Sequence, residues 1–215
     1  HAQATELAKC IQDPKYFMTE HCWIQHPTKG RLKFDLFPYQ QELVDTYHEH
    51  RYSIALISRQ MGKSTAAAGY LLWYAMFNPD QTILIAAHKY SGAQEIMQRI
   101  RFAYETLPDH LRAGAVSYNK GSIEFDNGSR ILSSTTTETT GRGMSLTLVY
   151  CDETSSTTIE HTYFNGAPIF TKRGADVCSK KGFLINTVSK LLLLLENEIE
   201  DYSPKEFTRF RYKFK

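Results

Sequence analysis

The sequence lacks the cysteine and histidine patterns that define disulfide-linked or zinc-binding proteins. No two cysteines have the C-x-x-C spacing, and no group of histidines completes a zinc set. The cysteines are Cys10, Cys22, Cys151 and Cys178. We therefore expect neither a disulfide framework nor a zinc site, and a reducing compartment is the default environment. His21 and His26 are likewise expected to be surface or core residues and not ligands.

Long hydrophobic runs are also missing. The leucine run at residues 191–195 is far too short to cross a bilayer, and no basic segment followed by an apolar one opens the chain. We therefore expect no association with a membrane. The first residue is His1 and not methionine, so we expect the sequence to be a piece of a longer protein.

The chain has little excess charge of either sign. Its formal net charge is +2 and its pI is near 8.3, with 42% hydrophobic and 22% charged residues. This is ordinary globular composition, with enough apolar residues for one core. It excludes a protein that coats nucleic acid through bulk positive charge, so a DNA partner would be held locally or transiently.

Three segments of the chain differ in character. Residues 1–51 mix aromatic residues and histidines with short helical patterns, and residues 52–153 alternate apolar runs with helical patterns. Residues 154–215 hold a Ser/Thr cluster, lysine-containing loops, a leucine run and a tail rich in Arg, Lys and Phe. The middle segment predicts strand–helix–strand units.

Within the middle segment, short apolar runs predict buried strands and longer periodic stretches predict helices. The expected strands are 52–57, 82–87 and 146–151, and the expected helices are 64–77 and 91–107. Asn127 and Gly128 stand between two further apolar runs, which is a strong hairpin signal.

A candidate phosphate loop lies between the first strand and the first helix. Gly62 permits a tight turn, Lys63 can reach the β- and γ-phosphates, and the Ser64 hydroxyl can bind Mg²⁺. The helix that follows points its N–H groups at the anion. Ile57 replaces the first glycine of the usual pattern, so a chance Gly-Lys-Ser at a helix start is the alternative. The expected nucleotide-binding residues are Ser58, Gln60, Met61, Gly62, Lys63, Ser64 and Thr65.

A carboxylate pair follows the last of the expected strands. Asp152 would hold Mg²⁺ through its water shell, and Glu153 would polarise the attacking water as the hydrolytic base. This use requires the strand to end at the edge of the sheet where ligands bind, and to lie beside the phosphate-loop strand. The alternative is a solvated turn, in which Asp is common.

These patterns together predict an α/β fold, a three-layer P-loop NTPase. We expect a mainly parallel sheet with helices on both faces and the Asn127-Gly128 hairpin as an antiparallel addition.

With both motifs in place, the chain resembles the large terminase subunits of tailed phages, close to the T-even-like branch. The resemblance covers roughly residues 15–153. It rests on motifs that recur in order, at residues 58–65, 87–89, 119–129, 140–145 and 148–153. That family also lacks the first loop glycine and carries an arginine inside the loop.

The resemblance implies a Mg²⁺-dependent ATPase that moves double-stranded DNA into a procapsid in the host cytoplasm. The implied partners are the DNA, the portal of the procapsid and the small terminase subunit. The chain would be a monomer alone and part of a ring of identical subunits when assembled. Residues 1–51 would then help to form the adenine pocket.

The family also suggests roles for three further residues. Gln40 matches the glutamine that contacts adenine, although without the family a solvent-facing position at a helix start would be the default. Arg59 matches a proposed arginine finger acting within the subunit, and Arg142 matches one proposed to reach a neighbouring subunit. The sequence leaves open which of the two arginines acts as the finger. Arg142 has the further alternative of a loop residue that binds nothing.

The resemblance stops after Glu153. We interpret residues 154–215 as a divergent tail. Within it, residues 183–189 would correspond to a later, threonine-rich strand of the family, and the tail could in this way complete the sheet. The family's C-terminal nuclease is not found in this sequence, which predicts ATP hydrolysis without DNA cleavage. The basic tail could bind nucleic acid, but a frayed, solvated terminus is the simpler interpretation.

Two other functions remain open. One is a helicase-like P-loop motor, although no helicase-specific motif follows in the sequence. The other is a non-catalytic remnant, truncated or interrupted, that binds nucleotide or partners without turnover.

Overall fold

The computed structural model describes residues 2–26, 28–57, 60–87, 89–135 and 144–152. Of the rest, it describes the backbone of four short strands at 163–164, 167–168, 182–186 and 207–211. The helices are α1 (Ala2–Gln12), α2 (Pro14–His21), α3 (Pro38–Glu49), α4 (Lys63–Phe77) and α5 (Tyr90–Glu105). The strands are β1 (Trp23–His26), β2 (Gly30–Lys33), β3 (Tyr52–Leu56), β4 (Thr82–Ala87), β5 (Ala115–Tyr118), β6 (Ser122–Phe125), β7 (Arg130–Thr135), β8 (Leu148–Asp152), β9 (Tyr163–Phe164), β10 (Ala167–Pro168), β11 (Gly182–Asn186) and β12 (Phe207–Arg211).

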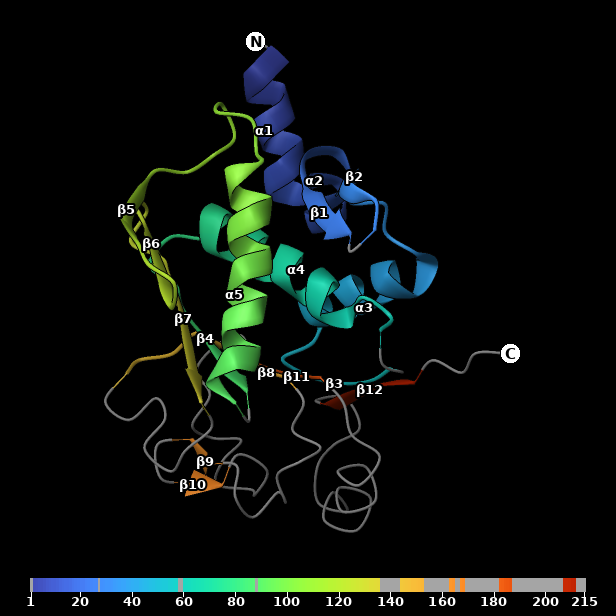
Figure 1. Cartoon of the computed structure of the whole chain (residues 1–215), viewed down its shortest axis with the longest axis vertical. Helices are drawn as coiled ribbons and strands as arrows, with labels where there is room; N and C mark the ends of the chain where they lie inside the picture. Colours follow the sequence, from blue (N-terminus) through green and yellow to red (C-terminus); the bar gives the residue numbers. More distant parts are fainter. Residues whose placement is uncertain are drawn as a thin grey trace.

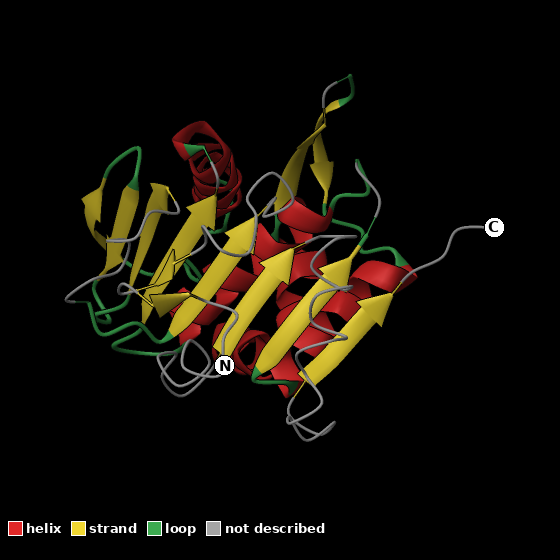
Figure 2. Ribbon diagram, turned by 90° about the horizontal axis from the view of Figure 1, so that it is seen from below, coloured by secondary structure: helices red, strands yellow, loops and turns green. Residues whose placement is uncertain are grey.

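One twisted sheet of eight strands organises the fold (Figure 2). Its order is β12-β3-β11-β8-β4-β7-β6-β5, and every neighbouring pair from β12 to β7 is parallel. The two strands at the far edge, β6 and β5, are antiparallel. The expected α/β fold with a mainly parallel sheet is therefore confirmed, as are the strands predicted at 52–57, 82–87 and 146–151.

The predicted hairpin joins β6 to β7, and its turn also closes the end of α4. Gly128 has a φ of +81°, a conformation that glycine adopts without steric cost. The Asn127 side-chain amide donates hydrogen bonds of 2.9 and 3.0 Å to the carbonyls of Ala75 and Met76. These carbonyls belong to the last turn of α4, so the hairpin turn supplies polar partners at the end of the helix.

The five described helices lie on one side of the sheet, as Figure 1 shows from the side and Figure 2 from the opposite face; α3, α4 and α5 contact the sheet, and α1 and α2 lie beyond them. The helices predicted at 64–77 and 91–107 correspond to α4 and α5, and both lie on this side, so the described residues hold no helix on the second face. α4 is buried over almost its whole length because α1–α3, α5 and the sheet surround it, and its Tyr70, Trp73 and Tyr74 rings pack together. A helix that is apolar all round is typical of such a central position.

The N-terminal segment packs onto the same hydrophobic core as the strands. That core runs from Cys10 and Phe17 to Tyr150. The Trp73 indole N–H donates a 2.7 Å hydrogen bond to the Cys10 carbonyl, and the Phe17 and Phe77 rings meet edge to face at 5.3 Å. Within the described residues, no helix combines the length and the apolar character that a bilayer crossing requires.

Candidate nucleotide site

The connection from β3 to α4 has the backbone shape of a phosphate-binding loop. Gln60 and Gly62 have φ values of +63° and +69°, both in the left-handed region. A side chain is strained there, and Gln60 tolerates this within the candidate site, where such strain is commonly found. The left-handed backbone therefore favours glycine at position 62, and a Cβ there would lie 2.6 Å from Nε2 of Gln40, so the end of that side chain would have to move.

A cavity of 730 Å³ lies in front of this loop, between the first turns of α4 and α5 and the ends of β4 and β8. This volume is within the usual range for small-molecule sites. Its lining residues are Gln60, Met61, Gly62, Lys63, Ser64, Thr65, Ala87, Lys89, Ser91, Gly92, Glu95, Arg99 and Asp152. Of the predicted nucleotide and metal residues, Gln60, Met61, Gly62, Lys63, Ser64, Thr65 and Asp152 therefore meet at one cavity.

The electrostatics of this cavity favour an anion. The N-termini of α4 and α5 both lie at its wall; Lys63 is the first residue of α4, and Lys89 is the N-cap residue of α5. Helix N-termini carry partial positive charge and unpaired N–H groups. Arg99 adds a third cation, 3.7 Å from the carboxylate of Glu95. The arrangement can hold a polyphosphate.

Ser64 and Asp152 form the contact that joins the loop to the sheet. The Ser64 hydroxyl donates a 3.2 Å hydrogen bond to Oδ2 of Asp152, and the Tyr150 hydroxyl donates to Oδ1 at 3.4 Å. Asp152 is the last residue of β8 and is 8% exposed. A hydroxyl and a carboxylate at this separation are the oxygen ligands that Mg²⁺ prefers, so these two residues fit the magnesium site expected from the sequence.

The expectation that the Asp152 strand lies beside the phosphate-loop strand is wrong. β11 is inserted between β3 and β8 and pairs with both in parallel register, with Asn186 opposite Asp152. The site does not need neighbouring strands, because the loop after β3 carries Ser64 to the end of β8. β11 belongs to the divergent tail, which thereby enters the centre of the sheet.

The Gln40 side chain stabilises the loop through hydrogen bonds to its backbone carbonyls. Its side-chain amide donates to the carbonyls of Met61 and Gly62 at 3.3 and 3.4 Å, and its Oε1 accepts from the Phe37 N–H at 3.1 Å. The Tyr39 hydroxyl donates to the same Met61 carbonyl at 2.8 Å. Gln40 is 4% exposed, so the solvent-facing alternative is wrong. Its contact with adenine stays a prediction.

Four predicted site residues, Ser58, Arg59, Arg142 and Glu153, lie outside the described residues. Conversely, the sequence reasoning missed the wall formed by α5 and the loop contact of Tyr39. The α5 residues Ser91, Glu95 and Arg99 recur four apart, a spacing that places them on one helix face. That spacing, together with the position of α5 directly after β4, was the signal available.

Comparison with known proteins identifies the family. Residues 54–162, just over half of the chain, match the family described as terminase large subunit, T4likevirus-type, N-terminal. The match includes the phosphate loop and the carboxylate pair.

Solved structures share the fold at low sequence identity. The large terminase of bacteriophage HK97 superposes with a TM-score of 0.72 at 16% identity, over 94% of this chain and 44% of that one. The large terminase ATPase domain of Thermus phage P74-26 gives 0.60 at 16% identity, over 82% and 80%. A large terminase from a thermophilic bacteriophage, solved in complex with ADP, gives 0.52 at 12% identity, over 82% and 45%.

The chain thus spans less than half of the HK97 large terminase, and about four fifths of a solved ATPase domain. The family match, the fold and the cavity agree with the resemblance found in the sequence. This chain belongs to the T4likevirus-type family of terminase large subunits and carries the family's N-terminal region.

Proposed function

We propose that this chain is the ATP-hydrolysing motor domain of a large terminase, which drives double-stranded viral DNA into a procapsid. The observation that carries the proposal is the convergence of Lys63, Ser64 and Asp152 on one cavity. Similarity to a solved ATPase domain and to a large terminase solved with ADP supports the choice of nucleotide.

Each described residue of the cavity has a role in this proposal. Lys63 contacts the β- and γ-phosphate oxygens, and the N–H groups at the start of α4 cradle the phosphates. Ser64, through its hydroxyl, and Asp152, through its carboxylate, would hold the metal ion. Bound Mg²⁺ offsets the charge of the phosphates and of the transition state.

The residues that act on the reacting atoms are proposed from the sequence. Glu153, which follows Asp152, orients and deprotonates the attacking water. Arg59 or Arg142 offsets the charge that develops on the transferred phosphoryl group, an effect worth ~10³ to 10⁵ in rate. Gln40 contacts adenine, and Ser58 belongs to the loop that surrounds the phosphates.

The partners proposed for this motor are double-stranded DNA, the portal of the procapsid and the small terminase subunit. The chain acts as a member of a ring of identical subunits in the host cytoplasm and is a monomer when alone.

The test is ATP turnover by the purified chain in the presence of Mg²⁺. We expect slow turnover that double-stranded DNA increases. Glu153→Gln should reduce turnover by about 10² to 10⁴-fold, the usual contribution of a general base, while nucleotide binding is retained. The matched control is Glu124→Gln, because Glu124 is an exposed residue of β6 and does not line the cavity.

Three outcomes would contradict the proposal. Nucleotide binding without turnover by the unmodified chain would indicate a non-catalytic remnant. ATP-driven separation of the strands of a tailed duplex would indicate a helicase-like motor. Equal turnover by the Glu153 and Glu124 variants would remove Glu153 from the mechanism.

A further inference from the structure

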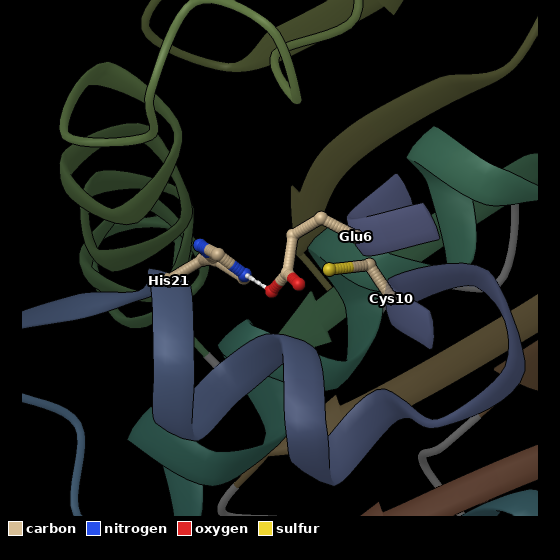
Figure 3. A group of neighbouring side chains, drawn as sticks. All are labelled: Glu6, Cys10 and His21. Carbon is tan, nitrogen blue, oxygen red and sulfur yellow. Dashed lines mark hydrogen bonds and ion pairs between the residues drawn. The ribbon is translucent and has the colours of Figure 1, made fainter. Parts of the chain in front are cut away.

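Three potential metal ligands converge at the junction of α1 and α2 (Figure 3). Glu6 and Cys10 are one turn apart on α1, and His21 is the last residue of α2. A carboxylate oxygen, the thiol sulfur and an imidazole nitrogen all lie within 4.8 Å of one another. None of the three residues lines the nucleotide cavity, so the cluster has no role in the proposed motor chemistry.

The donor set suits zinc. Zn²⁺ binds oxygen, nitrogen and sulfur ligands at about 2.0–2.3 Å in tetrahedral geometry, which places neighbouring donors about 3.3–3.8 Å apart. The present separations need to change by only about an ångström to reach this geometry. A carboxylate and a thiolate together neutralise the charge of the ion.

The cluster is already oriented by its surroundings. Oε1 of Glu6 lies 2.9 Å from Nε2 of His21 and accepts a 2.7 Å hydrogen bond from the Tyr16 hydroxyl. These hydrogen bonds, that from Tyr16 above all, lower the pKa of Glu6 and keep it charged. Lys9 is 3.7 Å from the other oxygen. Hydrogen bonds that fix a ligating carboxylate in this way are a common feature of zinc sites.

We propose that Glu6, Cys10 and His21 bind one Zn²⁺ ion, with water as the fourth ligand, and that the ion fixes α1 against α2. The Cys10 thiol gives its proton to solvent when it binds, and Nε2 of His21 exchanges its contact with Glu6 for the metal. The side chains of Glu6 and His21 are 27% and 15% exposed and mark the side from which the ion would enter, whereas Cys10 is fully buried.

The ion would reinforce the support of the phosphate-loop helix. The Cys10 carbonyl accepts the hydrogen bond of Trp73, and Phe17 of α2 packs on Phe77; both partners belong to α4. Zinc at the junction of α1 and α2 therefore stabilises the layer on which α4 rests. The competing explanation is a purely hydrogen-bonded cluster, since Glu6, Tyr16 and His21 already satisfy one another.

The test titrates the full chain, purified under reducing conditions and stripped with a chelator, with Co²⁺ and then with Zn²⁺. We expect one equivalent of Co²⁺ to give a thiolate-to-metal absorption band that Zn²⁺ removes, with submicromolar affinity for Zn²⁺. Cys10→Ser should abolish the band. His21→Gln should weaken Zn²⁺ binding by at least about 10 to 100-fold, which is the usual loss when a residue that hydrogen-bonds to a ligand is removed.

Two controls separate ligation from folding. Cys22→Ser changes another buried cysteine, directly after α2, that is not in the cluster, and His26→Gln changes a histidine on β1. Both should retain the band and the affinity. If Cys10→Ser fails to fold by circular dichroism, the unfolding temperature decides, because Zn²⁺ should raise it in the unmodified chain and not in His21→Gln.

The proposal is overturned if Zn²⁺ does not bind at micromolar concentration, or if Cys10→Ser and His21→Gln bind it as the controls do. The hydrogen-bonded cluster would then be the whole explanation. None of these measurements uses ATP, so failure here would leave the proposed motor function untouched, and failure of the motor would leave the zinc proposal untouched.

Discussion

At the scale of single residues, two glycines of nearly identical backbone conformation face very different surroundings. Gly62 has a φ of +69° and Gly30 a φ of +71°. A Cβ on Gly62 would lie 2.6 Å from Nε2 of Gln40, whereas a Cβ on Gly30 would meet nothing within 4 Å. Replacing each glycine with alanine therefore separates two free-energy costs, that of a side chain in the left-handed conformation and that of the contact with Gln40.

We expect Gly30→Ala to lower the free energy of unfolding by about 1–2 kcal/mol, the cost of a side chain in the left-handed region. Gly62→Ala should cost the same amount plus the displacement of Gln40 from the loop carbonyls, and it should weaken ATP binding at least tenfold. Urea unfolding and nucleotide titration of both variants check this. Equal nucleotide affinities would show that Gln40 does not shape the loop.

The buried tyrosines of α4 predict how stability changes at high pH. Burial raises the pKa of Tyr74 to about 12 and that of Tyr70 still further. In the unfolded chain these groups lose their protons near pH 10. The folded state therefore binds more protons between these values, so its stability is fully present below pH 10 and is lost as the pH rises toward 12.

We expect Tyr74→Phe to make this alkaline loss shallower. Tyr90→Phe should leave it unchanged, because Tyr90 is 43% exposed. Urea unfolding at a series of pH values from neutral to alkaline measures the slopes. If the two slopes coincide, the burial of Tyr74 is not what links stability to pH.

At the scale of elements, the β6–β7 hairpin acts as a cap for α4. The Asn127 amide binds two carbonyls of the last helical turn, which would otherwise be left without a partner at a partly buried position. We expect Asn127→Ala to lower the free energy of unfolding by about 1–3 kcal/mol, the cost of an unsatisfied buried polar group. Chemical denaturation measures this loss.

The control for the hairpin is Asn119→Ala. Asn119 is exposed, and among the described residues its side-chain amide donates to the Ser117 hydroxyl alone, so the expected change is within about 0.5 kcal/mol. A similar loss in both variants would show that the effect comes from the asparagine side chain in general and not from capping of the helix.

Elements were largely predictable from the sequence, and their order in the sheet was not. Apolar runs between polar residues fixed β3, β4 and β8 to within two residues, because burial is encoded in local composition. The insertion of β11 between β3 and β8 has no such signal, since pairing partners depend on packing between distant segments.

The candidate site shows the same division. Short sequence motifs indicate the chemistry of the phosphate-loop residues Gln60–Thr65 and of Asp152, so these residues were predicted. The support from Tyr39 and the wall residue Arg99 were missed, because each reaches the site through tertiary contacts. The proximity of Glu6, Cys10 and His21 was not predicted for a related reason, since these residues come from two helices and match no spacing pattern.

At the scale of the whole molecule, β11 joins two parts of the sheet, which are linked to each other through its pairing. It pairs on one side with β3 and on the other with β8, whereas β12 pairs only with β3 at the edge. A chain that ends after residue 170 should leave two buried strand edges unpaired, which is costly and favours aggregation. We expect such a chain to be insoluble or to lose its cooperative unfolding transition.

The matched comparison is a chain that ends after residue 204. It loses only β12, so it should remain folded with a lower unfolding temperature. Thermal unfolding and limited proteolysis of the two truncated chains provide the measurement. A stable, cooperative fold in the shorter chain would show that the pairing of β11 contributes little to the sheet.

The late position of β11 in the chain also bears on how the protein is made. The ribosome translates β3 and β8 before residues 182–186, which at about 5–20 residues per second follow Asp152 by on the order of seconds. During that interval the nascent chain has a gap at the centre of its sheet. Chaperones that shield exposed strand edges would therefore act on this protein before its nucleotide site can assemble.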